Sequence, residues 1–294
     1  MRLYRKVFHF SAAVLSGLML LPGCSTDESL KPTDQTQLET RGLISGGTAN
    51  TALIGLSANN ELVSLLSGPP ASEQSVIPII GLRSEEVMLA IDTRTKTKQL
   101  YGVSDRSIIY VIDKFSGVAT PLFGGSFTPV ISGNVVAFDV NPADDLIRLM
   151  TDTGQSLRIS PVTGLVVGVD NSVNILQTVI NSVAYLPSTS IGGGTKSVLY
   201  DIDIASGNLY KQLSATSPLQ LVGNTGFAWQ GEGGFEITAA GGGFAVQYGH
   251  ARTSGGLGSD DLSQDACRLY SINLKTGKAT SLGKVRPMIG IAQK

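Results

Sequence analysis

Short apolar runs recur along the chain from Thr51 onward, separated by segments rich in Gly, Asp, Asn, Ser and Thr. Runs of this length between turn signals predict β-strands. One unit is repeated at 107–123, 198–213 and 268–283, with a degenerate copy at 160–169. Each copy has an apolar run, a turn residue (Asp or Asn in the three clear copies), variable residues, Ser or Thr, and Gly. We interpret the unit as a hairpin in which the Asp or Asn accepts backbone N–H groups and the Gly is left-handed, rather than as a set of ligands.

A strand of small residues precedes each group of three further strand candidates. These small-residue strands are expected at 87–92, 135–140, 181–187, 234–239 and 288–292. The group of the last strand is split, because its other strands are expected at 52–57, 61–66 and 75–80. We therefore predict an all-β fold, a β-propeller of five four-stranded blades closed by pairing of the N- and C-terminal strands. Six blades remain an alternative if 186–197 and 249–266 contain further strands.

The N-terminus has the order of a signal peptide. Three basic residues precede a mostly apolar run at 7–21, which is shorter than the roughly 20 residues of a membrane-spanning helix. The sequence Leu21-Pro22-Gly23-Cys24 then resembles the lipobox of bacterial lipoproteins, which implies cleavage before Cys24 and a diacylglyceryl group on its thiol. An ordinary secretory signal with an incidental cysteine is the alternative. We expect three segments: signal peptide 1–23, lipidated Cys and flexible tether 24–50, and propeller 51–294.

Composition excludes several classes of protein. With 22 basic and 23 acidic residues the chain has no basic excess, so nucleic acid is not an expected partner. An apolar content of 42% is enough for a packed core and argues against disorder. The two cysteines are Cys24 and Cys267, so no disulfide is expected if Cys24 is acylated.

The stretch beginning at Val135 reads VVAFDVNPADDLIRLMTDTGQSLRISPVTG. It resembles a pattern, FDxNP…DxIRxxSDTGQNLRxNPxTG, of a family of bacterial secreted and lipoprotein domains known as a domain of unknown function. The positions that fit are Phe138, Asp139, Asn141, Pro142, Arg148, Asp152, Thr153, Gly154, Gln155, Leu157, Arg158, Pro161, Thr163 and Gly164. The family's NPPN stretch is absent, with Lys211-QLSATSP in its place. The resemblance covers roughly 51–294 and implies a propeller-like extracytoplasmic domain without an assigned activity.

Few residues suit catalysis or a metal. His250 is the one histidine left after processing, and GxSxG, HExxH and P-loop patterns are absent. We therefore expect no metal site and no cofactor. Three acids, Asp92, Asp139 and Glu236, lie on the small-residue strands, which line the channel of a propeller. They are candidates for glycosidic cleavage, for contact with a polar ligand or ion, or for no more than turn formation.

A second candidate is an arginine pair. Arg148 and Arg158 stand opposite each other in a hairpin centred on Thr153, and opposed cations need an anion nearby. Asp139, Asp144 or Asp145 would give a structural ion-pair network, and we expect an acid of 139–152 within reach of at least one arginine. Asp152 is part of the same candidate site, and an anionic ligand is the alternative.

Together these features predict a lipid-anchored, monomeric propeller of the cell envelope, on the outer membrane or cell surface. We expect a binding or assembly module whose partner is an envelope protein or glycan. The alternative is a carbohydrate- or lactone-active hydrolase that uses the channel carboxylates. Ionised acids around a pocket would favour the hydrolase, and a channel filled with apolar side chains would favour the module.

Overall fold

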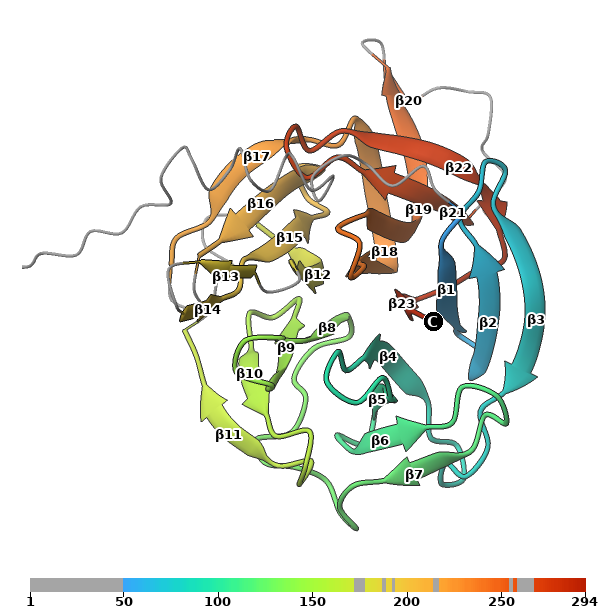
Figure 1. The fold of residues 1–294 in the computed structure, drawn as a ribbon, viewed down its shortest axis with the longest axis vertical. Coiled ribbons are helices and arrows are strands. Elements are labelled where there is room, and N and C mark those ends of the chain that lie inside the picture. Colours follow the sequence, from blue (N-terminus) through green and yellow to red (C-terminus); the bar gives the residue numbers. More distant parts are fainter. Residues whose placement is uncertain are drawn as a thin grey trace, which may run out of the picture.

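Five four-stranded antiparallel sheets stand as blades around a central axis (Figure 1). This computed structural model describes residues 50–171, 178–186, 189–191, 194–213, 217–253, 256–257 and 267–294. From the axis outward, blade 1 consists of β23 (Gly290–Gln293), β1 (Ala52–Ser57), β2 (Glu61–Leu66) and β3 (Ser72–Pro78). Blade 2 consists of β4 (Met88–Thr93), β5 (Leu100–Ser104), β6 (Ile109–Ile112) and β7 (Ala119–Pro121). Blade 3 consists of β8 (Val136–Val140), β9 (Ile147–Thr151), β10 (Ser156–Ile159) and β11 (Val166–Val169).

Blades 4 and 5 complete the ring. Blade 4 consists of β12 (Ile180–Tyr185), β15 (Leu199–Asp203), β16 (Asn208–Gln212) and β17 (Gln220–Asn224). Blade 5 consists of β18 (Phe227–Ile237), β19 (Gly243–Thr253), β21 (Cys267–Ile272) and β22 (Ala279–Val285). The chain also forms a hairpin of β13 (Thr189–Ile191) and β14 (Gly194–Lys196), and β20 (Gly256–Leu257) pairs with β19. These extra strands do not make a sixth blade within the described residues, so the prediction of five is confirmed.

The ring closes as the sequence predicts. β23 pairs antiparallel with β1, with Leu53 opposite Gln293 and Leu56 opposite Gly290. The C-terminal strand therefore occupies the innermost position of the blade that begins at the N-terminus (Figure 1).

The repeated turns are also confirmed. Asp113 Oδ1 accepts the N–H groups of Phe115 and Ser116 at 2.9 and 2.7 Å, and Gly117 has a φ of 74°. Asn273 accepts two N–H groups in the same way. These side chains are committed to their own turns, as the hairpin interpretation requires.

The core lies in layers between neighbouring blades. One buried cluster joins blades 1 and 2 through Ile54 and Ile91, and the next joins blades 2 and 3 through Val103 and Leu149. Counting only the residues that the structure describes, the layer between blades 3 and 4 is the smallest, with six buried apolar residues. Each strand alternates its side chains between two layers, so side chains at the axis point toward one neighbouring blade or the other.

Small residues let the innermost strands approach closely. A Cβ atom at Gly234 of β18 would lie 2.8 Å from Gly290 Cα of β23.

Along the described part of the chain, no helix is long and apolar enough to cross a membrane. The predicted signal peptide, Cys24 and residues 25–49 of the tether lie outside the described residues, as do residues 254–255 and 258–266 of the loop at 249–266.

Candidate functional site: the axial pocket

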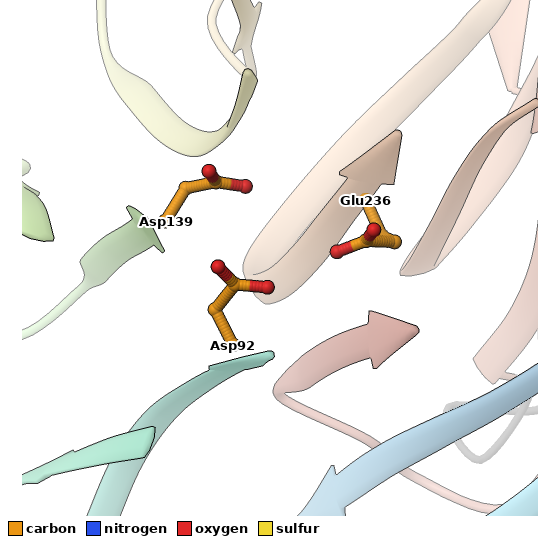
Figure 2. Close-up of side chains that lie close together, drawn as sticks. All are labelled: Asp92, Asp139 and Glu236. Atoms are coloured by element: carbon orange, nitrogen blue, oxygen red, sulfur yellow. The ribbon is translucent and has the colours of Figure 1, made fainter. Parts of the chain in front are cut away.

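Three carboxyl groups from three blades meet at one end of the central axis. Asp92 of β4, Asp139 of β8 and Glu236 of β18 each offer an oxygen, and these oxygens all lie within 4.8 Å of one another. Figure 2 shows the three side chains pointing toward one another. We refer to these three residues as the axial acids. The axial acids Asp92, Asp139 and Glu236 are only 5%, 5% and 6% exposed, so their carboxyl groups have little contact with bulk water.

The alternation of the inner strands positions each axial acid. Ile91 packs between blades 1 and 2, so Asp92 turns the other way, toward blade 3, where its Oδ2 accepts the N–H of Val140 at 2.8 Å. Asp139 likewise accepts the N–H of Tyr185 in blade 4. Glu236 accepts the N–H of Gln293 in blade 1. Each axial acid is thus fixed by the blade that follows its own.

Burial raises the pKa of all three axial acids. Desolvation raises the pKa of Asp92, although the N–H groups of Val140 and Thr93 oppose the shift. Desolvation and the neighbouring charges of Asp92 and Glu236 hold the pKa of Asp139 well above its usual range. The pKa of Glu236 is also well above its usual range, through burial and through the charge of Asp92, to which it is hydrogen-bonded. No axial acid forms an ion pair with a basic side chain of the described residues.

The axial acids open onto a cavity of about 240 Å³. Tyr185 of β12 and Gln293 of β23 continue the polar wall beside them. Two lysines in turns of blade 2, Lys98 and Lys114, also line it. Further lining comes from Thr93, Thr95, Val140, Pro142, Ile237, Ala239 and Lys294.

Comparison with known proteins places the chain in a family. The model of a domain of unknown function, DUF4394, matches residues 61–292. The chain belongs to this family. The match spans nearly the whole propeller, as the resemblance of the 135–164 stretch implied. No curated protein matches this DUF4394 chain.

Two kinds of chemistry suit the axial acids. Three carboxylate oxygens at this spacing can surround a hard cation, which prefers oxygen ligands, or a protonated amine that donates to all three. Alternatively, a carboxylic acid with a raised pKa beside a second carboxyl group is the acid–base pair of a glycosidase.

The arginine pair is a separate, closed ion-pair cluster. Arg148 and Arg158 are cross-strand partners, as predicted. The acid between them is Asp170, whose Oδ2 pairs with Arg148 and lies 3.1 Å from Arg158 Nε. Our expectation of an acid from 139–152 is therefore wrong. Asp152 instead accepts the N–H of Asn134 at 3.0 Å, at the other end of the hairpin.

The sequence predicted that the three axial acids lie in the channel, but it did not predict Asp170 beside the arginines or the lysines of the axial pocket. Asp170 lies just after β11, and the ladder β9–β10–β11 brings it to Arg158 on the neighbouring strand and to Arg148 two strands away. The turns that contain Lys98 and Lys114 can be predicted from the residues around them. That both turns project toward the axis follows only from the ring.

Proposed function

We propose that this DUF4394 domain is a lipid-anchored binding module of the cell envelope whose small ligand occupies the axial pocket. We further propose that the ligand places a positive charge among Asp92, Asp139 and Glu236. The observation that carries this is the meeting of three nearly buried carboxyl groups at an open cavity without a basic partner among the described residues. Burying carboxylates costs free energy unless a cation compensates them. A cationic ligand would supply that compensation.

Thermal unfolding with cationic probes tests the binding. The mature chain in detergent is melted with calcium, magnesium or manganese chloride in one arm and with alkylammonium chlorides in the other, against sodium chloride at equal ionic strength. A ligand that binds only the native state raises the melting temperature, by an amount that grows with the logarithm of 1 plus the ratio of the free ligand concentration to Kd. We expect at least one probe to stabilise the wild type, and the arm in which it falls identifies a metal ion or an organic ammonium.

Two variants make the test specific. Asp139→Asn keeps an oxygen that accepts the Tyr185 N–H but removes the charge from the pocket, so it should lose the stabilisation. Asp201→Asn is the matched control, because Asp201 is also fully buried but does not line the pocket. The proposal is wrong if no probe stabilises the wild type, or if both variants respond equally.

A hydrolase is the second candidate, supported by the hydrogen-bonded Asp92–Glu236 pair with raised pKa values. Its test is the release of nitrophenol from a panel of nitrophenyl glycosides and the opening of simple lactones. Turnover by the wild type that disappears in Glu236→Gln would replace the binding proposal. We expect no turnover, because on the binding proposal the positive group of the ligand occupies the space among these carboxyl groups.

A further inference from the structure

The axial pocket contains positive as well as negative groups. Lys98, in the turn after β4, and Lys114, in the turn after β6, line the same cavity as the axial acids. Lys294 also lines it, although its Nζ donates to Ser64 Oγ at 2.7 Å. The negative groups come from three inner strands, whereas Lys98 and Lys114 come from turns of a single blade. The two signs of charge are therefore supplied by different parts of the wall.

The two sets do not neutralise each other. Across the described residues, neither Lys98 nor Lys114 pairs with a carboxylate, and the axial acids pair with no lysine. The turn can form an ion pair where an acid is within reach, since Lys96 Nζ lies 3.3 Å from Asp145 Oδ2. Burial and the charges of Lys98 and Lys294 lower the pKa of Lys114, which shows that positive charge accumulates on this side.

The ligand that fits such a wall is small and carries both charges. The acids and the lysines line different parts of one cavity, so a ligand with a single charge would leave one set uncompensated. The cavity, about 240 Å³, is smaller than the roughly 300–1,000 Å³ of pockets for drug-sized molecules. Val140, Pro142, Ile237 and Ala239 supply the apolar part of the lining.

We propose that the axial pocket binds a small aminocarboxylate zwitterion, with its ammonium group among the axial acids and its carboxylate against Lys98 and Lys114. This inference rests on the proposed function, because it assumes that the axial acids receive the positive charge. It adds the negative end of the ligand and thereby the chemical class.

Isothermal titration of the mature chain in detergent tests it with a series of zwitterions. Glycine, β-alanine, γ-aminobutyrate and ε-aminocaproate separate the two charges by increasing lengths of chain. Ethylammonium and acetate carry one charge each. We expect one zwitterion to bind at least about tenfold more tightly than either single-charge probe, as an added charge-assisted hydrogen bond provides. The best chain length would report the distance between the two charged walls.

Variants assign each end of the ligand. Lys98→Gln and Lys114→Gln should each weaken the best zwitterion by about tenfold without weakening ethylammonium. Asp139→Asn should abolish binding of both probes. Lys96→Gln is the matched control, since Lys96 is in the same turn as Lys98 but does not line the cavity, and it should change neither affinity.

The outcomes separate the two proposals. If ethylammonium or a metal ion binds but no zwitterion binds more tightly, the inference is overturned and the proposed function stands. If Lys96→Gln weakens the zwitterion as much as Lys98→Gln does, the effect is one of general surface charge and the inference is again overturned. If neither a cationic probe nor a zwitterion binds, both proposals fail.

Discussion

At the scale of single residues, Asp201 shows how a buried acid affects stability. It is fully buried on β15, and Gln212 Nε2 donates to its two oxygens at 3.0 and 3.1 Å. Burial raises its pKa from 3.8 to about 7. The native state therefore keeps a proton that the unfolded chain releases above about pH 4, so stability from this group falls as pH rises from about 4 to about 7.

Asp201→Asn should remove this dependence, because an amide does not ionise. We expect the variant to exceed the wild type in free energy of unfolding by a few kcal/mol near pH 8, since one pKa unit corresponds to about 1.4 kcal/mol. The advantage should shrink toward about pH 4, where Asp201 is protonated in both states. Urea unfolding of both chains across this range is the measurement, and a difference that does not change with pH would contradict the assignment.

Cys24 carries the prediction about location. A thioether-linked diacylglycerol would anchor the chain with about 0.8 kcal/mol per buried CH₂ group, which the polar residues of the tether cannot replace. Cys24→Ala should therefore move the protein from the membrane pellet to the soluble fraction. Cys267→Ala is a suitable control, because that thiol is buried in the propeller and free. Retention of Cys24→Ala in the membrane would rule out the lipid anchor.

At the scale of strands and blades, the layer between blades 3 and 4 depends on polar contacts more than the other layers do. Among the described residues it has the smallest apolar cluster, and beside it Arg148 Nη1 donates to Ser156 Oγ at 3.0 Å and pairs with Asp170. The side chains of Arg148 and Asp170 are 4% and 8% exposed, whereas that of Arg158 is 37% exposed. The two arginines should therefore contribute unequally.

Arg148→Met should cost about 3–5 kcal/mol, the usual effect of removing one partner of a buried ion pair. Arg158→Met should cost about 1 kcal/mol or less, because solvent screens a partly exposed pair. Chemical unfolding of the two variants measures the difference. Equal losses, or a larger loss for Arg158→Met, would contradict the role assigned to Asp170.

At the scale of the whole molecule, ring closure should dominate stability. Deletion of residues 287–294 removes β23, uncovers the edge of β1 and takes Ile289, Ile291 and Ala292 from the core. An exposed edge invites pairing with another chain. We expect the truncated chain to aggregate or to unfold at a much lower temperature in size-exclusion and melting experiments. A monomer that melts like the wild type would contradict the importance of closure.

The same scale explains what the sequence could and could not predict. Closure was predicted because one group of strands is split between the two ends of the chain. Strands and turns were predicted, because alternation and the Asp-to-Gly turn are local signals. The axial acids were placed in the channel for the same reason. Their meeting depends on the direction in which each inner strand turns its side chains around a closed ring. The shape of the cavity and the presence of lysines in its wall depend on where turns of different blades lie along the axis. No local pattern of residues encodes these positions.

The most direct measurement of the central claim is a crystal structure of the mature chain soaked with the tightest-binding probe. The account predicts that the probe occupies the axial pocket, with its positive group within hydrogen-bonding or coordination distance of Asp92, Asp139 and Glu236. A probe bound elsewhere on the propeller, or one whose positive group points away from these three carboxylates, would contradict the account.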